Sequence, residues 1–175
     1  LEHVLGRTGE FWKKYFDKGS TIFITGGTGF FGKWLLETFI HINYKLNLDG
    51  KIIVLSRNPG KFLNEFPQFN LPLIKFLKGD ILSFSFPEDK IDYIIHAAVE
   101  SSVRINMEQP LFMYNLIVES TKKVLELAKE KKVKALLYTS SGSVYGKQPS
   151  DLTHVPEEYT GSPDIYSPDA AFGEG

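Results

Sequence analysis

Three glycines near the start of the chain have a spacing that suits phosphate binding, in the pattern Gly26-x-x-Gly29-x-x-Gly32. The apolar stretch 21–25 precedes them, and the helix-forming stretch 33–40 follows. In a turn that binds a dinucleotide, the first glycine lets the chain leave its strand, and the second removes a Cβ where the pyrophosphate approaches. The third lets the helix pack closely on the strand, and the first N–H groups of the helix, which lack intrahelical partners, face the phosphates. The spacing therefore predicts a dinucleotide-binding turn.

The same residues allow two other interpretations. Gly27-x-x-x-x-Gly32-Lys33 matches a P-loop except at its last position, where Trp34 replaces the Ser or Thr that holds Mg²⁺. A glycine-rich turn without any ligand is the third interpretation. The strand before the turn and the helix after it favour the dinucleotide, because that context is part of the motif.

Further apolar segments alternate with helical patterns along the chain. Strands are expected at 21–25, 51–56, 73–77, 91–97 and 133–139. Between them we expect a helix that ends near Asn43 with the apolar stripe Trp34, Leu35, Phe39 and Ile42, a short helix at 61–66, and a long helix from Gln109-Pro110 to the cluster Lys129–Lys132. This alternation predicts an α/β fold with a doubly wound parallel sheet, a Rossmann-type three-layer αβα architecture. Residues 148–171 are rich in Pro, Asp and Ser and are expected to form a loop near a site.

The first twenty residues form a separate pattern. Phe11, Trp12, Tyr15 and Phe16 recur at helical spacing, and Gly19 suggests the end of that helix. A helix that covers part of the sheet is favoured over a partner-binding helix. We therefore divide the chain into a helical extension, 1–20, and a dinucleotide-binding domain, 21–175.

Composition excludes several classes of protein. The chain has 175 residues, 20 basic and 21 acidic, and a net charge of −1, so no charge excess points to nucleic acid or an anionic membrane. It has no cysteine, which excludes disulfides and thiolate chemistry. No apolar run approaches the roughly 20 residues of a membrane span, and no secretory leader is recognisable, so a cytoplasmic location is expected. The chain begins with Leu1 and ends at Gly175, which suggests a fragment.

Small or polar residues follow all five expected strands. In an open α/β sheet, ligands bind beyond the carboxyl ends of the strands, where the strand order reverses. The residues at those ends are Gly26–Gly32, Ser56-Arg57, Gly79-Asp80, His96-Ala97-Ala98 and Thr139-Ser140-Ser141. They are the candidates for ligand binding. His96 itself is expected to be a strand-end histidine with its hydrogen bonds satisfied rather than a base.

At these motifs the chain resembles the extended short-chain dehydrogenases/reductases, and within them the nucleotide-sugar epimerases and dehydratases. The resemblance runs from Thr21 onward and rests on Thr25-Gly-Gly-Thr-Gly-Phe-Phe-Gly32, Gly79-Asp80, His96-Ala97-Ala98 and Thr139-Ser-Ser-Gly-Ser-Val-Tyr-Gly146. It implies that Phe30 and Phe31 hold the pyrophosphate through their N–H groups, that Asp80 takes the adenine amino group, and that Ala97 and Ala98 lie along the nicotinamide-side ribose. The other cofactor contacts expected on this basis are Gly26, Thr28, Gly29, Gly32, Ser56, Arg57, Ile81, Thr139 and Ser140.

The second strand bears on the choice of cofactor. A carboxylate at its end would hold the ribose 2′-OH of NAD and repel a 2′-phosphate. Here Ser56-Arg57 stands instead, and an arginine can pair with phosphate through two hydrogen bonds. The cofactor is therefore NADP or NAD, with a weak lean to NADP. An exposed loop arginine without a role is the alternative.

The resemblance also implies catalytic positions. Ser141 stands at the family's catalytic Ser/Thr position and would hydrogen-bond the reacting oxygen, although Ser140, Ser141 and Ser143 could merely cap a turn. The family's acid/base is the tyrosine of Tyr-x-x-x-Lys, and Phe172 stands at that position, with the lysine expected immediately after Gly175. Since phenylalanine cannot ionise, a loss of about 10²–10⁴ in rate is expected.

A second departure lies in the long helix. Where the family often has Asn-x-x-Gly-Thr, this chain has Ile117-Val-Glu-Ser-Thr121, and Asn115 stands two positions early. The resemblance implies hydride transfer to and from a sugar carbon through a keto intermediate. The substrate lobe is absent from this chain, so we expect it to be inactive by itself. A nucleotide sugar is the expected partner, no metal is expected, and a homodimer is left open. The alternatives are a non-catalytic dinucleotide-binding or sensing module and a carbonyl reductase acting on a small or lipid substrate.

Overall fold

The computed structural model describes residues 1–100 and 102–175, and these residues form two compact units. The first unit comprises Leu1–Ala98 and Lys123–Tyr138, and the second comprises Val99–Lys122 and Thr139–Gly175. We describe each unit by itself.

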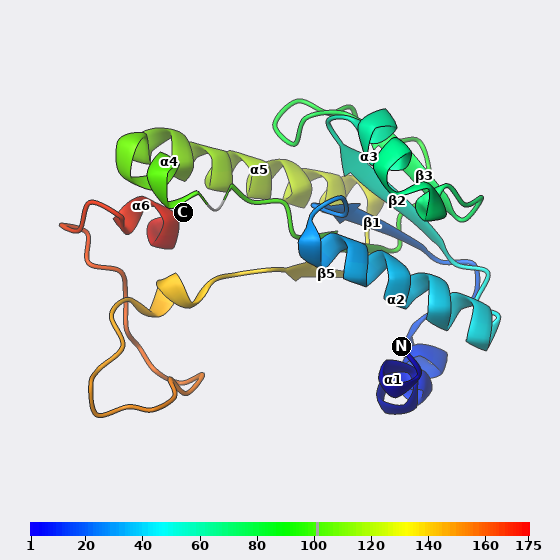
Figure 1. Ribbon diagram of the computed structural model, residues 1–175, viewed down its shortest axis with the longest axis horizontal. Helices are drawn as coiled ribbons and strands as arrows, with labels where there is room; N and C mark the ends of the chain where they lie inside the picture. The colour runs from blue at the N-terminus through cyan, green and yellow to red at the C-terminus, as the bar shows by residue number, and fades with distance from the viewer. Residues whose placement is uncertain (101) are drawn as a thin grey trace. The chain divides into compact units, whose positions relative to one another are not determined.

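The first unit is built on a parallel sheet of five strands (Figure 1). The strands are β1 (Thr21–Thr25), β2 (Lys51–Ser56), β3 (Ile74–Lys78), β4 (Tyr93–His96) and β5 (Ala135–Tyr138). Their order is β3-β2-β1-β4-β5, so the chain reverses direction across the sheet between β1 and β4. In the register, Ile24 of β1 lies beside Val54 of β2 and Ile95 of β4. The predicted doubly wound parallel sheet is confirmed.

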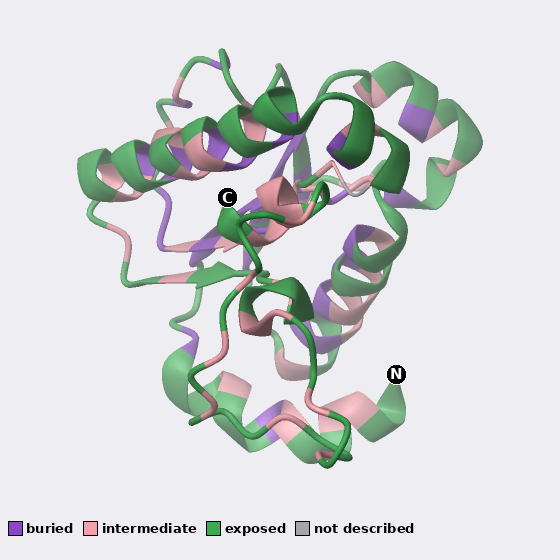
Figure 2. Ribbon diagram, turned by 90° about the vertical axis from the view of Figure 1, so that its left-hand side faces the viewer, coloured by how far each residue is buried: buried purple, intermediate pink, exposed green. Residues whose placement is uncertain are grey.

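The central strands are buried and the last one is not. Every residue of β1 is buried, and so is every residue of β2 after Lys51, as expected for parallel strands covered on both faces (Figure 2). In contrast, β5 pairs with β4 alone among the described strands, and the side chain of Leu137 is 55% exposed. Both β4 and β5 are shorter than predicted. The segments before them, from Ile91 and from Val133, lie outside the assigned strands, although the N–H of Asp92 donates to the carbonyl of Thr21 and the N–H of Lys134 donates to the carbonyl of Asp92.

The first helix, α1 (Glu2–Tyr15), packs through one face on the core. Trp12 contacts Phe39 of α2 at a ring-centroid distance of 6.2 Å, and Phe16, just beyond the helix, stacks on Tyr93 of β4 at 5.5 Å. The prediction of a covering helix is thereby confirmed. The predicted end at Gly19 was wrong, because the backbone is already extended at Phe16. The other two aromatic side chains of the pattern, Phe11 and Tyr15, are exposed.

The second helix, α2 (Phe30–Leu46), corrects two predictions. It ends at Leu46 rather than near Asn43, where Asn47 adopts a left-handed conformation with a φ of 51°. Its buried residues are Gly32, Leu36, Phe39, Ile42 and Asn43, whereas Trp34 is 59% exposed and Leu35 is 36% exposed. The reason is the contact of Gly32 with the turn before the helix. Leu36 and Phe39, four and seven positions later, share its face, whereas Trp34, two positions later, does not. Leu35, three positions later, lies at the edge of that face.

Shorter elements complete the two units. In the first unit, α3 (Pro59–Glu65) begins two residues before the predicted position, because the Asn58 side chain accepts a hydrogen bond from the N–H of Lys61. A 3-10 turn, η1 (Pro67–Phe69), follows α3. The second unit contains α4 (Val103–Glu108), which was not predicted, and which Ser102 caps by accepting a bond from the N–H of Ile105. It also contains η2 (Gly142–Tyr145) and α6 (Ala170–Glu174). The long helix α5 (Pro110–Lys131) was predicted, and it has residues in both units.

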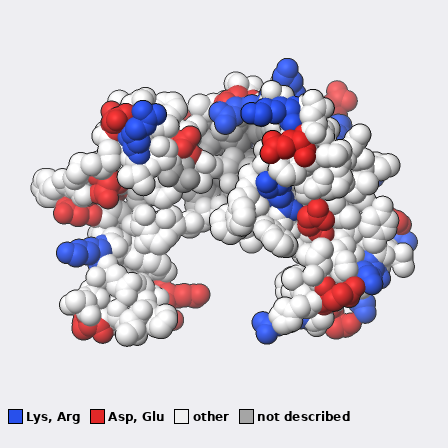
Figure 3. Space-filling view, viewed as in Figure 1, with Lys and Arg blue, Asp and Glu red and all other residues white. Residues whose placement is uncertain are grey.

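The surface charges and the hydropathy of the helices can be described for the residues that the structure covers. Basic and acidic side chains are interspersed on the face shown in Figure 3. None of the described helices combines the length and the apolar character that crossing a membrane requires.

Candidate functional site

The glycine turn lies between β1 and α2, where the strand order reverses. Gly26 has a φ of +74°, and a Cβ on it would lie 2.6 Å from the carbonyl carbon of Ala97 and 2.8 Å from the nitrogen of Ala98. A Cβ on Gly32 would lie 2.5 Å from the backbone of Gly27. These two glycines are therefore required by the packing of the protein itself. The close approach of Gly32 is to the backbone of the turn, not to the strand as predicted.

Gly29 differs from the other two, because little in the protein requires it. A Cβ on Gly29 would meet only the carbonyl oxygen of Gly26, at 3.3 Å, and its φ of −78° is open to any residue. The residue is exposed and precedes α2, whose N-terminus has no side-chain cap. Among the described residues, no group accepts a hydrogen bond from the N–H of Phe30 or Phe31. An exposed helix start with free N–H donors and no Cβ in front of it suits an anion.

Thr25, the last residue of β1, organises the strand ends around this turn, and sequence reasoning did not single it out. Its fully buried hydroxyl accepts hydrogen bonds from the N–H groups of Ala97 and Ala98, each at 3.1 Å. The same oxygen lies 2.7 Å from Nδ1 of His96. Since a hydroxyl has two lone pairs and one proton, both lone pairs are used and the proton is donated to Nδ1. The one available signal was its position immediately before Gly26.

His96 must be neutral for this arrangement, because only an unprotonated Nδ1 can accept. The side chain is 2% exposed, and burial lowers its pKa from 6.5 to about 4. The imidazole is thus uncharged at neutral pH. This agrees with the expectation that His96 is a satisfied strand-end histidine. Its ring also lies 5.6 Å from that of Tyr138 at the end of β5.

The ends of β2 and β3 present the remaining candidates of the first unit. Ser56 is buried and its carbonyl accepts from the N–H of Gly79, which holds the two strand ends together. Arg57 is exposed and makes no ion pair with another described residue. Asp80 is exposed, and one of its carboxylate oxygens accepts from the N–H of Leu82 at 3.0 Å. The second oxygen remains available to a ligand. The other two candidates, Thr28 and Ile81, are half-buried.

Lys33 argues against the P-loop interpretation. A P-loop lysine reaches the β- and γ-phosphates. Here Nζ of Lys33 lies over the ring of Phe66, 4.0 Å from its centroid, which is a cation–π contact. The side chain therefore points toward the end of α3 rather than along the turn.

The second unit holds the residues expected to act in catalysis. Thr139 and Ser140 are exposed and follow β5. Ser141 stands at the N-cap of η2, where its oxygen accepts from the N–H of Ser143 at 3.2 Å. The capping role that was weighed as the alternative is thus present in the structure. It leaves the hydroxyl proton of Ser141 to donate, and the nearest acceptor shown is Oγ of Ser143 at 3.3 Å.

Phe172 and the altered helix motif lie in the same unit. Phe172 is half-buried in α6. Ile117 is 5% exposed and contacts the position of Gly175, so its apolar side chain fills space within the unit. Asn115 is exposed on α5 and does not replace the missing amide.

A parallel sheet with a glycine turn at its point of reversal, and free helix N–H donors beside it, is the Rossmann-type fold that dinucleotide-binding proteins use. The sequence profile described as "NAD dependent epimerase/dehydratase family" matches residues 22–173. The chain belongs to this family.

Individual relatives support the assignment. The chain is 32% identical over 123 residues to a UDP-N-acetylglucosamine 4,6-dehydratase (inverting) of Campylobacter jejuni, covering 69% of this chain and 36% of that protein. It is also 32% identical over 133 residues to a sterol-4-alpha-carboxylate 3-dehydrogenase (decarboxylating) of Saccharomyces cerevisiae, covering 73% of this chain and 36% of that protein. Among solved structures, an NAD-dependent NDP-hexosamine 5,6-dehydratase of tunicamycin biosynthesis matches with a TM-score of 0.65 and 26% identity, over 88% of this chain and 46% of the other. The chain thus spans about a third of the length of these two relatives.

Proposed function

We propose that this chain is the cofactor-binding part of an NAD(P)-dependent epimerase or dehydratase that acts on nucleotide sugars. The observation that carries the proposal is the start of α2. Packing constrains Gly29 less than Gly26 and Gly32, and no described residue accepts a hydrogen bond from the N–H groups of Phe30 and Phe31. A pyrophosphate would supply the acceptor and would use the space that a Cβ on Gly29 would fill. The names of the relatives, most of which act on UDP- or dTDP-sugars, support the substrate class.

The other strand ends complete the proposed cofactor site. Asp80 would accept a hydrogen bond from the adenine amino group with its free carboxylate oxygen. Ala97 and Ala98, fixed by the hydroxyl of Thr25, would lie along the nicotinamide-side ribose. Ser56, Thr28 and Ile81 would line the adenosine side, and Thr139 and Ser140 the nicotinamide side.

The reaction follows from the cofactor and from Ser141. A nicotinamide held by these strand ends would supply hydride transfer from and back to a sugar carbon, which would take the sugar through a ketone during epimerisation or elimination. Ser141 would orient the reacting sugar oxygen with its hydroxyl proton, while its oxygen continues to accept from the N–H of Ser143. Phe172 would stand beside the same oxygen without taking its proton, because its ring has no ionisable group. Another group or the solvent must then move the proton, and a chain with Phe172 should turn over about 10²–10⁴-fold more slowly than one with tyrosine.

Arg57 favours NADP over NAD. It is exposed and makes no ion pair with another described residue, so its guanidinium is available to a 2′-phosphate. No carboxylate follows β2 to hold the 2′-OH of NAD. NAD binding would lack this ion pair and should be weaker.

Titration calorimetry of the chain with NADP and with NAD tests the cofactor proposal. Saturable binding is expected, and Gly29→Ala should weaken it at least tenfold, since the new methyl group would occupy the space of the pyrophosphate. Gly29→Ala should lose some stability but far less than Gly26→Ala, because its Cβ would lie 3.3 Å from the carbonyl oxygen of Gly26, a close contact that a shift of a few tenths of an ångström relieves. Gly60→Ala in α3 is the matched control, since a Cβ there would lie no closer than 3.9 Å to any atom. Absence of binding to either cofactor would refute the proposal.

A non-catalytic dinucleotide-binding or sensing module is the second candidate, and Phe172 favours it. This candidate predicts cofactor binding with no turnover in the longest form of the protein, and no gain from Phe172→Tyr. The epimerase or dehydratase proposal predicts turnover of a nucleotide sugar that Phe172→Tyr raises. The sterol dehydrogenase relative supports a third candidate function, reduction of a small or lipid carbonyl compound. The turnover assay should therefore include such a compound as a substrate.

The division of the chain is part of the proposal. We assign residues 1–20 as a helical extension and 21–175 as the dinucleotide-binding domain. The family profile begins at residue 22, which supports this boundary. The relatives are about three times as long as the region they share with this chain, which supports a separate substrate lobe outside it.

A further inference from the structure

The sequence contains one Asp-Gly pair, Asp49-Gly50, and it lies between α2 and β2. An aspartate followed by glycine is the aspartyl pair that isomerises most readily, because glycine has no side chain to shield its backbone nitrogen. The pair is therefore a candidate for a spontaneous change of the main chain. Whether it reacts depends on how the fold holds the two reacting groups.

The reaction joins the backbone nitrogen of Gly50 to the side-chain carbon Cγ of Asp49. The carboxyl group, once protonated by the solvent, loses its OH, which leaves with the amide proton as water, and a cyclic imide forms. Water then opens the ring. Opening at the main-chain carbonyl leaves Gly50 attached through Cγ, so the product is isoaspartate, and the composition of the chain is unchanged.

A buried side chain holds the attacking nitrogen. The N–H of Gly50 donates a hydrogen bond to Oδ1 of Asn43 in α2 at 2.8 Å, and Asn43 is 8% exposed. The nitrogen must lose this proton to become a nucleophile. An acceptor that is fixed and shielded from water keeps the proton in place, so the nucleophile is blocked in the folded chain.

Two aromatic rings enclose the same glycine. A Cβ on Gly50 would lie 2.9 Å from an atom of the Phe16 ring and 2.9 Å from an atom of the Phe39 ring, and both side chains are buried. Gly50 therefore cannot turn toward the side chain of Asp49 without displacing a ring. The packing adds a second barrier to the hydrogen bond.

Main-chain hydrogen bonds fix the segment on either side of the pair. The carbonyl of Leu48 accepts from the N–H of Gly19 at 2.8 Å, and the N–H of Lys51 donates to the carbonyl of Ser20 at 3.0 Å. The backbone before and after the pair is thus tied to the segment that leads into β1. Ring closure requires at least part of this arrangement to open.

The carboxylate of Asp49, in contrast, is accessible. Its side chain is 69% exposed and forms an ion pair with Lys18, itself 68% exposed, at 2.9 Å. Such a pair in water contributes little. Asp49 has a φ of +50°, a left-handed conformation in which aspartate is found more often than most residues. The carboxyl group is therefore ready to react, and only the nitrogen is protected.

We propose that Asp49-Gly50 is a site of spontaneous isoaspartate formation whose rate is set by the hydrogen bond from Gly50 to Asn43. The folded arrangement does not react, so the product forms only from molecules in which this segment has opened locally. Isoaspartate adds one carbon atom to the main chain just before β2, so Gly50 would no longer fit between the two rings. The modified chain should therefore be less stable. It also carries a new α-carboxylate, the group that protein-isoaspartate methyltransferases recognise.

Peptide mapping of the aged chain measures the reaction. After incubation in neutral buffer at physiological temperature, trypsin releases the peptide 46–51, whose aspartyl and isoaspartyl forms have equal mass and separate by chromatography. Methylation by a protein-isoaspartate methyltransferase identifies the second form. The synthetic peptide 45–54 gives the rate without a fold, and hydrogen exchange of the Gly50 amide gives the population of the open form. The chain should react more slowly than the peptide, by about the factor by which its Gly50 amide is protected from exchange.

Three variants separate the hydrogen bond from the other contacts. Asn43→Leu keeps the shape of the side chain but removes the acceptor, and it should raise the rate about fivefold or more, because a buried N–H without an acceptor favours opening. Asn43→Asp keeps an oxygen in the same place and should react more slowly than Asn43→Leu. Lys18→Met is the matched control, since it removes the exposed contact of the pair, and it should change the rate by less than about twofold.

Several results would overturn the inference. They are isomerisation of Asp49 as fast in the chain as in the peptide, exchange of the Gly50 amide as in an unfolded chain, and an unchanged rate in Asn43→Leu. If Asn43→Leu does not fold, the comparison of the wild-type chain with the peptide still decides. The experiment uses no ligand, so its outcome is independent of the cofactor assignment.

Discussion

Replacing Thr25 by valine should destabilise the protein although the two side chains have nearly the same shape. The hydroxyl of Thr25 serves three partners, the N–H groups of Ala97 and Ala98 and Nδ1 of His96. The N–H of Ala97 also lies 3.3 Å from the carbonyl of Thr25, so it keeps one acceptor in the variant. Two groups lose the hydroxyl as a partner, the N–H of Ala98 and the imidazole Nδ1.

The magnitude follows from the burial of those two groups. A buried polar group without a partner costs about 1–3 kcal/mol. His96 is 2% exposed, so its share should be in the middle of that range, whereas Ala98 is half-buried and should contribute at the lower end. We expect Thr25→Val to lower the free energy of unfolding by about 3 kcal/mol. Because Ala97 and Ala98 would also lose their anchor, the affinity for NADP should fall.

Equilibrium unfolding in urea, followed by circular dichroism, measures the first effect. Thr25→Ser is the control, since it keeps the hydroxyl and removes one methyl group from a buried site, at a cost of about 1 kcal/mol. The serine variant should therefore be more stable than the valine variant although it packs less well. A valine variant as stable as wild type, or more stable than the serine variant, would refute the role assigned to the hydroxyl.

Four further predictions follow from the same unit. The pKa of His96 is about 4 in the folded protein, below its usual 6.5, so the unfolded chain binds the proton more tightly. The stabilising effect should be complete above pH 6.5, and the free energy of unfolding should fall by about 3 kcal/mol as the pH drops to 4. Urea unfolding at several pH values measures this change, and His96→Asn should remove it. Burial alone would raise the pKa of Asp92, but hydrogen bonds from Lys90, the N–H of Thr21 and Lys134 outweigh this effect and lower the pKa from 3.8 to about 2. Above pH 4 this carboxylate should therefore contribute about 2 kcal/mol to the free energy of unfolding, and the contribution should be lost as the pH falls toward 2. An Asp92→Asn variant should show a shallower loss of stability over that acid range, and an unchanged slope would contradict the assignment. Gly26→Ala should unfold the chain or prevent its expression in soluble form, in contrast to Gly29→Ala, because its Cβ would overlap the backbone of Ala97 at a φ of +74°. Lys33→Met should leave NADP affinity within about twofold in calorimetry, since Lys33 lies over Phe66, and a complete loss of binding would revive the P-loop interpretation.

The fold could be predicted from the sequence because its signals are local and redundant. β1 and β2 were placed correctly to the residue, since each is a continuous apolar run bounded by turn residues. The doubly wound parallel sheet was predicted from the alternation of strands with helices, whereas the order of its strands comes from the structure. The apolar stripe of α2 was predicted correctly at Phe39 and Ile42, which are buried. It was wrong at Trp34, which is apolar but lies away from the face that Gly32 fixes, and at Leu35, which lies at the edge of that face.

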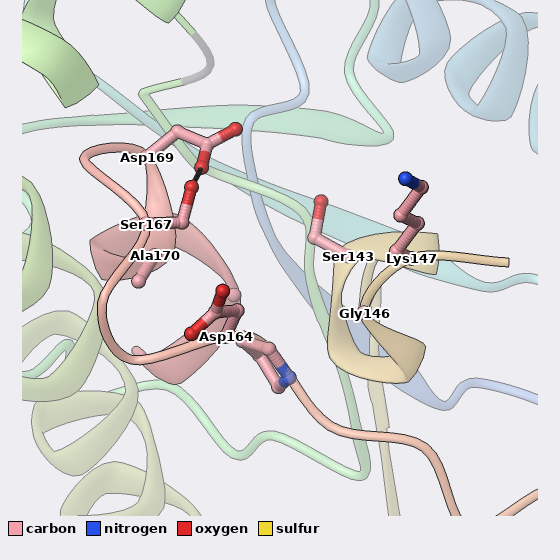
Figure 4. A pocket seen from close by; sticks show the side chains of 9 residues that line it. Ser143, Gly146, Lys147, Asp164, Ser167, Asp169 and Ala170 are labelled. Atoms are coloured by element: carbon pink, nitrogen blue, oxygen red, sulfur yellow. Dashed lines mark hydrogen bonds between the residues drawn. The ribbon is translucent and has the colours of Figure 1, made fainter.

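The candidate site was only partly visible in the sequence, for a physical reason. Gly26, Asp80 and Ala97 could be found because each belongs to a short motif at a strand end. Thr25 could not, since its role depends on β4 being its neighbour in the sheet, 71 positions along the chain. Residues 148–171 were expected to form a loop near a site, and part of this loop lines a pocket with η2 (Figure 4). The lining residues could not be predicted, because the loop has no periodicity from which its contact with η2 follows.

The outer side of β5 has a practical consequence. The strand pairs with β4 alone among the described strands, and Leu137 is more than half exposed, so a row of backbone donors and acceptors beside an apolar side chain faces the surroundings. Such an edge is a template on which another chain can add a strand. Concentrated solutions of this chain should therefore become turbid and form aggregates that bind thioflavin T, and Leu137→Lys should prevent this aggregation.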